Sequence, residues 1–262
     1  MNAQEEEKPA PVLELDRVSK SFGGVRAAQE VSFSVASGHI HALIGPNGAG
    51  KTTLFNLITG IYPADDGSVL FEGRDVGRLE VYERVAAGIA RTFQNVELFT
   101  GMSVLENVMV GLHVRTRCGF FGALAKWPWV RREEEQARGT ALDWLKFVGL
   151  EKMAESQAGD LPFGWQRLVE IARALASRPR LLLLDEPAAG LNARETRDLG
   201  VLLRQIRTRG VTLLLVEHDM SLTMEISDRI VVLDQGRKIA EGTPREIQAD
   251  EKVLAAYLGQ GE

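Results

Sequence analysis

The chain has 262 residues, with 31 Lys and Arg against 36 Asp and Glu, so its formal net charge is −5. Hydrophobic residues make up 45% and charged residues 26%, which is ordinary for a soluble globular protein and excludes disorder throughout. The mild acidity disfavours a nucleic-acid-binding protein. The single cysteine, Cys118, excludes a disulfide framework, and no apolar run is long enough to span a bilayer. The composition therefore predicts a soluble cytoplasmic protein.

The first third of the chain is predicted to be rich in strands. An acidic stretch at residues 1–10 is expected to be a disordered tail. Alternating apolar residues over 12–35 predict strands with one buried face. A buried strand is expected at 39–44, a helix around 54–58, and a further strand at 68–71.

The middle of the chain changes to a helical pattern. Apolar residues recur at helical spacing through 103–177, with no strand pattern between them. Near-continuous apolar runs return at 181–184 and 211–216, as in parallel strands covered by helices on both faces, followed by a shorter run at 229–233. The remaining helices are expected at 193–209, 219–226 and 244–258. This order predicts an α/β fold with a helical insertion.

A glycine-rich segment stands between the strand at 39–44 and the following helix. From Gly45 to Thr52 it fits the pattern G-x-x-x-x-G-K-[ST]. Its glycines let successive N–H groups turn toward one anion, and the helix directs its positive end to the same place. Lys51 can reach the β- and γ-phosphates, and the Thr52 hydroxyl can bind Mg²⁺. The predicted nucleotide contacts are Gly45, Pro46, Asn47, Gly48, Ala49, Gly50, Lys51, Thr52 and Thr53.

Two carboxylates end the buried strand at 181–184. Asp185 is expected to hold Mg²⁺ directly or through water, and Glu186 to orient or deprotonate the attacking water. Taken alone, the pair is explained equally well as a helix N-cap after a core strand. The phosphate-binding loop favours catalysis.

These motifs, and the segments around them, resemble the ATP-binding cassette family over about residues 12–258. The resemblance implies a P-loop NTPase fold with a mostly parallel core sheet, an N-terminal antiparallel β-subdomain and an inserted helical subdomain at about 95–177. It implies one nucleotide-binding domain over 11–262. It also implies ATP hydrolysis, with ATP and Mg²⁺ as cofactors.

The resemblance assigns roles to further residues. Gln94, after Thr92 and Phe93, stands at the family's Q-loop, which touches Mg²⁺ and the attacking water; without the family it is an ordinary surface glutamine. His218 would contact the γ-phosphate, although a lone histidine is usually a satisfied polar residue. Phe22 would stack on adenine, with a core phenylalanine as the alternative. The D-loop would comprise Ala189, Gly190, Leu191 and Asn192.

The family signature is altered in this chain. The family's usual segment is L-S-G-G-Q; it opens a helix and caps the γ-phosphate of ATP held by a partner subunit. In this chain only Leu161 and Gly164 keep the residue types of that segment. The serine hydroxyl is lost, and Pro162 has no N–H. The predicted signature loop is Leu161, Pro162, Phe163, Gly164, Trp165 and Gln166.

Finer segments resemble the ATP-binding subunit of branched-chain amino-acid importers, the LivG-like type. They are 188–192, 217–220, 226–230, 241–244 and 256–259. The resemblance implies uptake of branched-chain amino acids or a related small solute. The implied partners are transmembrane permease subunits, a second ATPase subunit of the same or a different kind and, indirectly, a periplasmic or extracellular solute-binding protein. It implies a peripheral location on the cytoplasmic face of the membrane and no nucleic-acid partner.

Two alternatives of other classes remain. A soluble mechanical cassette acting in translation or DNA repair usually carries two cassettes or a long coiled coil. A P-loop kinase would need a phosphoryl-acceptor pocket.

Within the chain, the aromatic and Arg residues of 113–138 fit either contact with a membrane partner or extra packing on the helical insertion.

Overall fold

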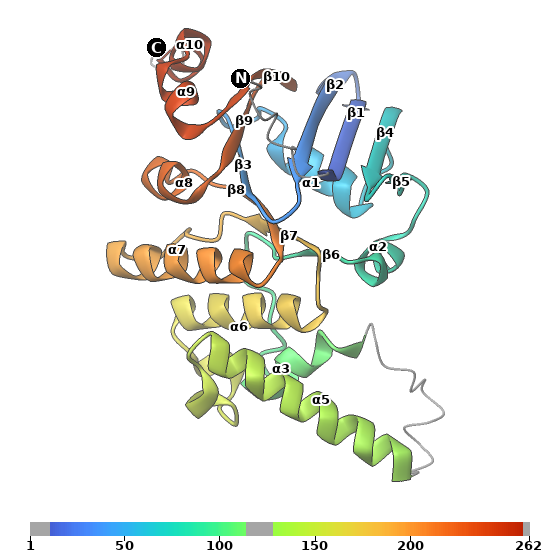
Figure 1. The fold of residues 1–262 in the computed structure, drawn as a ribbon, viewed down its shortest axis with the longest axis vertical. Coiled ribbons are helices and arrows are strands. Elements are labelled where there is room, and N and C mark those ends of the chain that lie inside the picture. The colour runs from blue at the N-terminus through green and yellow to red at the C-terminus, as the bar shows by residue number, and fades with distance from the viewer. Residues whose placement is uncertain (1–10, 114–127, 259–262) are drawn as a thin grey trace, which may run out of the picture. The chain divides into compact units, whose positions relative to one another are not determined.

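The computed structural model describes residues 11–113 and 128–258 (Figure 1). The chain divides into one unit of Met1–Glu80 with Leu203–Glu262 and a second unit of Val81–Leu202. The second boundary lies inside helix α7 (Ala193–Thr208). The predicted disordered tail at 1–10, and the aromatic side chains of the 113–138 segment, lie outside the residues and side chains that the structure describes.

The first unit contains an antiparallel sheet in the order β2-β1-β4-β5. Leu13, Leu15 and Val18 are buried along β1, as the alternating pattern predicts. Gly23 and Gly24, both with positive φ, make the turn from β1 to β2. The strands are β1 (Pro11–Phe22), β2 (Val25–Ala36), β4 (Asp66–Phe71) and β5 (Arg74–Asp75).

The first unit also contains parallel strands. Strand β3 pairs in parallel with both β8 and β9, and β10 is antiparallel to β9. Every residue of β3 and β8 is buried, which explains their continuous apolar runs. Helix α1 (Lys51–Thr59) follows β3 and buries the predicted apolar face. The strands are β3 (Ile40–Ile44), β8 (Thr212–Val216), β9 (Arg229–Asp234) and β10 (Arg237–Gly242).

The C-terminal region differs from the prediction. The single helix expected at 244–258 is two helices, α9 (Pro244–Ala249) and α10 (Glu251–Leu258), which follow α8 (Met220–Ile226) in the fold. Asp250 has a non-helical ψ of 116°, and its Oδ1 accepts a hydrogen bond from the Lys252 N–H at 2.8 Å. It therefore ends α9 and caps α10.

The second unit joins two parallel strands to a group of helices. Strands β6 (Ile89–Arg91) and β7 (Leu181–Asp185) pair in parallel. The three-residue β6 was not predicted, because so short a run has no readable period. Helices α3, α5 and α6 pack against one another (Figure 1). The helices are α2 (Val81–Ala87), α3 (Val104–Val110), α5 (Pro128–Phe147) and α6 (Phe163–Ala176), with 3₁₀ turns at Glu151–Met153 and Ala158–Asp160.

His41 makes the stability of the first unit depend on pH. Its side chain, in β3, is 1% exposed; Nε2 accepts a hydrogen bond from the Ala36 N–H at 3.2 Å. Nδ1 has no hydrogen-bond partner in the described part of the chain. Burial, and then the charges of His39 and Arg229, lower the pKa of His41 from 6.5 to about 4, against a smaller opposing effect of Glu241 and Asp228.

Acidification is therefore expected to destabilise the fold between pH 6.5 and pH 4. Above this range His41 is neutral in both states. Within it, the unfolded chain binds a proton that the folded chain does not, which lowers the free energy of unfolding by about 2 kcal/mol at pH 5 relative to pH 7.5. Urea unfolding at both pH values measures this. His41→Gln keeps a hydrogen-bond acceptor but cannot titrate, so its free energy of unfolding should fall less on acidification, by about 2 kcal/mol. An equal fall in the wild-type and variant proteins would contradict the assignment of this pH dependence to His41.

Candidate active site

The phosphate-binding loop has a backbone that only glycine tolerates at two positions. Gly45 has a φ of +152°, and Gly50, which caps α1, has a φ of +100°. A Cβ on Gly45 would lie 2.2 Å from the Leu233 carbonyl oxygen. A Cβ on Gly50 would lie 2.2 Å from the carbonyl oxygen of Ala27. The loop is thus packed against β2 and β9 and held in one conformation.

Lys51 and Thr52 open helix α1 directly after the loop. Lys51 is buried, and its Nζ donates to the carbonyl oxygens of Gly45 at 2.7 Å and Pro46 at 2.9 Å. The ammonium group therefore lies inside the loop that is predicted to surround the phosphates. Thr52 is exposed. These positions suit the roles predicted for both residues.

Phe22 lies at the end of β1 with 41% of its surface exposed. Its ring contacts that of Tyr62 edge-on, with the centroids 5.1 Å apart, and Lys20 Nζ lies 5.6 Å from its centroid. The exposure contradicts the alternative of a core phenylalanine. An exposed ring can stack on a base, and the adenine contact itself stays a prediction.

His218 lies at the same edge of the sheet as the loop. Leu43 of β3 pairs with Val216 of β8, so Gly45 and His218 each follow two residues beyond this pair. The buried Glu217 carboxylate accepts from the N–H groups of His218 at 2.9 Å and Asp219 at 3.1 Å. This turn leaves the imidazole exposed at the carboxyl end of the sheet, where open α/β sheets bind ligands.

In the second unit, three of the predicted residues converge after β6 and β7. Asp185 ends β7 and is 4% exposed, and Glu186 follows it. Gln94 lies three residues beyond β6, and its Nε2 donates to Glu186 Oε2 at 2.9 Å. Because β6 and β7 are parallel, their carboxyl ends meet at one edge.

Glu186 has a strained backbone, with a φ of +47° that non-glycine residues rarely adopt. Strain of this kind is typical of functional sites. Helix α7 begins only at Ala193, and Asn192 Oδ1 caps it by accepting from the N–H groups of Arg194 at 2.9 Å and Glu195 at 3.1 Å. The alternative interpretation of Asp185 and Glu186 as a helix cap is therefore wrong.

The signature loop and the D-loop contact each other. Pro162 caps α6, and its carbonyl oxygen accepts from the N–H groups of Trp165 at 2.9 Å and Gln166 at 3.0 Å. Phe163 and Trp165 are 46% and 41% exposed. A Cβ on Gly190 would lie 3.0 Å from the Phe163 ring, so the phenylalanine that replaces the signature glycine packs on the D-loop.

The sequence analysis missed Arg91, Tyr62 and the buried ion pair of Arg167 and Glu170 in α6. Arg91 Nη2 lies 2.7 Å from Asp185 Oδ2, with both side chains buried, and its guanidinium lies 5.2 Å from the Phe93 ring centroid. A basic residue at the end of one parallel strand and a carboxylate at the end of its neighbour were the available signal, but β6 had not been predicted. Tyr62 had no local signal.

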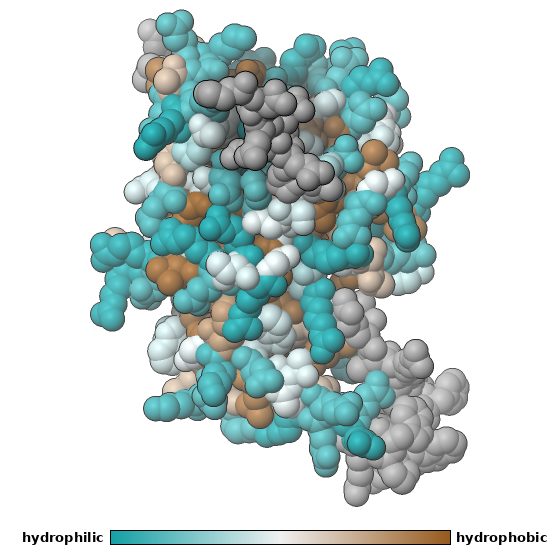
Figure 2. Space-filling view, viewed as in Figure 1, coloured by the Kyte–Doolittle hydropathy of each residue, from teal (hydrophilic) through white to brown (hydrophobic). Residues whose placement is uncertain are grey.

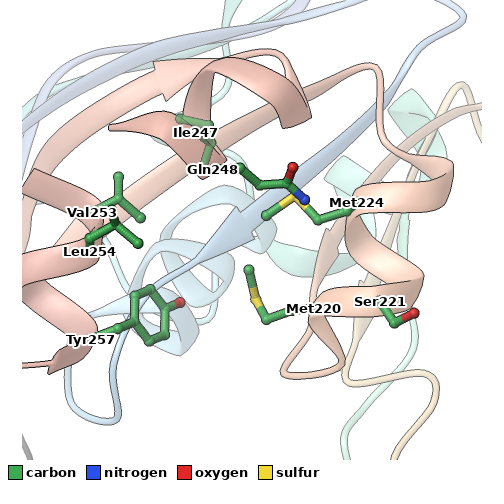
Figure 3. Close-up of a pocket in the computed structure, with 8 residues that line it drawn as sticks. All are labelled: Met220, Ser221, Met224, Ile247, Gln248, Val253, Leu254 and Tyr257. Carbon is green, nitrogen blue, oxygen red and sulfur yellow. The ribbon is translucent and has the colours of Figure 1, made fainter. Parts of the chain in front are cut away.

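A groove of about 510 Å³ lies in the first unit (Figure 3). It lies among α8, α9 and α10. Burial raises the pKa of the Tyr257 hydroxyl, and the nearby backbone of Gly45 opposes this effect. The last turn of α10 therefore lies near the start of the phosphate loop. The lining residues are Met220, Ser221, Met224, Ile247, Gln248, Val253, Leu254 and Tyr257.

Comparison with known families decides what this arrangement belongs to. Residues 28–189 match the model of the ABC transporter family. The chain belongs to the ATP-binding cassette (ABC) transporter family. Residues 237–262 also match the model described as a branched-chain amino acid ATP-binding cassette transporter. This second match contains α9 and α10, which supply five of the eight residues lining the groove.

Relatives and solved structures cover nearly the whole cassette. The chain is 45% identical to the high-affinity branched-chain amino acid transport ATP-binding protein BraF of Pseudomonas aeruginosa, over 95% of this chain and 98% of that protein. It is 43% identical, with the same coverage, to the corresponding protein LivG of Escherichia coli.

Two solved ABC structures confirm the predicted fold class. The ADP conformation of an ATP-binding cassette from an ABC transporter matches with a TM-score of 0.83 and 34% identity, covering 96% of this chain and 100% of that one. A dimeric cassette in a post-hydrolysis state, bound to ADP and Pi, matches with a TM-score of 0.75 and 28% identity, covering 89% and 99%. The family thus binds nucleotide with this fold.

No helix in the described ranges combines the length and apolar character needed to cross a membrane. On the face seen in Figure 2, hydrophobic residues are interspersed among hydrophilic ones.

Proposed function

We propose that this chain is the ATP-binding and ATP-hydrolysing subunit of an importer for branched-chain amino acids or a related small solute. The observation that carries the proposal is the match to BraF and LivG over 95% of this chain, together with the second family match at residues 237–262. The same matches favour an importer subunit over a mechanical cassette or a P-loop kinase.

Each predicted site residue has a distinct proposed role in ATP binding or hydrolysis. The loop from Gly45 to Thr53 binds the phosphates through its N–H groups, and Lys51 neutralises their charge. Glu186 accepts the proton of the attacking water, and Gln94 orients the Glu186 carboxylate through the hydrogen bond between them. His218 supports the γ-phosphate, and Phe22 stacks on adenine.

Thr52, Gln94 and Asp185 would hold Mg²⁺. All three offer oxygen ligands, which this ion prefers, and the family's nucleotide phosphates supply others. No group of three or more His, Cys, Asp or Glu residues that could hold a metal is found in the described ranges. When bound, Mg²⁺ neutralises charge on the phosphates.

Two cassettes act together, each signature loop completing the ATP site of the other. The exposed Phe163 and Trp165, and the dimeric state of the related cassette bound to ADP and Pi, support this. The second cassette is the same chain or a different one. The pair couples to transmembrane permease subunits on the cytoplasmic face of the membrane, and through them to a solute-binding protein.

Co-purification tests the proposal. The full chain is produced with the permease subunits of a branched-chain amino-acid importer from the same genome and purified in detergent through a tag on the permease. We expect it to co-purify and, in proteoliposomes, to drive uptake of leucine delivered by the solute-binding protein. A Lys51→Ala control should co-purify but not support uptake. Absence of co-purification, or uptake independent of ATP, would overturn the proposal.

A further inference from the structure

A buried ion pair lies one turn into the helix that follows the signature loop. Arg167 and Glu170, on α6, have side chains 0% and 1% exposed, and Arg167 Nη1 lies 3.0 Å from Glu170 Oε2. Burying two charges costs solvation that their attraction does not reliably repay. A hydrophobic pair would fill this space without that desolvation cost. The other groups that Arg167 and Glu170 bind explain why this position carries charged residues.

Both members of the pair bind the backbone just before and at Gln94. Arg167 Nη1 donates to the Phe93 carbonyl oxygen at 2.7 Å, and Nη2 donates to the Gln94 carbonyl oxygen at 2.8 Å. The Phe93 N–H donates to Glu170 Oε1 at 3.1 Å. Three backbone groups of two consecutive residues are thus held by two side chains more than 70 positions away in the sequence.

The same arginine also contacts the signature loop. Its guanidinium lies 5.6 Å from the ring centroid of Phe163, which packs on the D-loop. On the other side, the side chain of Gln94 donates to Glu186 at 2.9 Å. A continuous set of contacts therefore runs from Phe163 through Arg167 and Gln94 to Glu186.

From this geometry we infer that Arg167, supported by Glu170, is a positioning residue that sets the place of Gln94 against Glu186. The inference rests on the proposed function. A shift of helix α6 moves the backbone of Gln94 directly, because Arg167 is forked across the carbonyl oxygens of Phe93 and Gln94. Glu170 holds the N–H of Phe93, which precedes both carbonyl groups. When the signature loop closes on ATP held by a partner, the movement is thereby transmitted to the Glu186 carboxylate of the same cassette.

Removal of both charges tests this. Loss of one partner alone would leave the other buried and unpaired, so the informative variant is Arg167→Met with Glu170→Met, because paired apolar replacement preserves folding best. We expect kcat for ATP hydrolysis by the full chain to fall about tenfold, with KM and nucleotide affinity unchanged. The control is Arg204→Met with Glu225→Met, which removes a solvent-exposed ion pair of the first unit and should leave kcat unchanged.

A double-mutant cycle separates positioning from general loss of structure. If Arg167 acts through Gln94, adding Gln94→Ala to the charge-free variant lowers kcat no further than Gln94→Ala alone. Multiplicative losses, or a wild-type kcat in the charge-free variant, would overturn the inference. If that variant does not fold, Arg167→Lys replaces it: a lysine cannot span both carbonyl oxygens, so an unchanged kcat would equally overturn it. Failure of the wild-type chain to hydrolyse ATP would instead refute the proposed function.

Discussion

Glu186→Gln is expected to abolish ATP turnover and to leave ATP binding intact. The Glu186 carboxylate, held by the Gln94 amide at 2.9 Å, is the only group that this cassette is proposed to use as a base toward water. An amide of the same shape cannot accept that proton. Loss of a general base lowers the rate about 10²- to 10⁴-fold. The phosphate loop does not contain Glu186, so nucleotide affinity has no reason to change.

Two measurements on the full chain separate these effects. Phosphate release reports turnover, and equilibrium binding of a fluorescent ATP analogue reports affinity. Glu155→Gln removes an exposed carboxylate that pairs with Arg138 in the same unit, and it should behave as wild type in both assays. Hydrolysis by Glu186→Gln at the wild-type rate would refute the catalytic assignment.

Gly50→Ala should destroy the nucleotide site by a purely steric route. The new Cβ would lie 2.2 Å from the Ala27 carbonyl oxygen and 3.5 Å from the Cα of Gly236. Both neighbours are backbone atoms: Ala27 lies in strand β2, and Gly236 is held by backbone hydrogen bonds to Gln29 and Ala49. The loop must therefore move. Displacement of a phosphate-positioning loop by about 1 Å lowers kcat/KM about hundredfold or more.

A second glycine separates the clash from the backbone conformation. Gly210 has a φ of +86°, close to the +100° of Gly50, but a Cβ there would meet nothing within 4 Å. Gly210→Ala should therefore cost only the left-handed conformation, about 1–2 kcal/mol in the free energy of unfolding, with kcat/KM unchanged. Equal losses of kcat/KM in the two variants would show that packing against Ala27 is not what forms the loop.

The sequence determined the parts of this protein whose chemistry is local. The phosphate loop could be read from eight consecutive residues, because glycine freedom, the lysine and the helix start all act within one turn of chain. The buried parallel strands could be read because burial on both faces leaves a continuous apolar run. Asp185, Glu186 and His218 were placed correctly at strand ends for the same reason.

Only the tertiary structure decided the contacts between distant segments. The short strand β6 is defined by its pairing with β7, and that pairing brings Arg91 to Asp185 and Gln94 to Glu186. Asp250 falls inside the single helix predicted at 244–258, and only the hydrogen bond from the Lys252 N–H to its side chain identifies it as the cap of α10. No role was predicted for Arg167 or Glu170 from the sequence. Their meaning comes from three hydrogen bonds to the Q-loop backbone, which no local pattern encodes because a backbone carbonyl oxygen has no residue type.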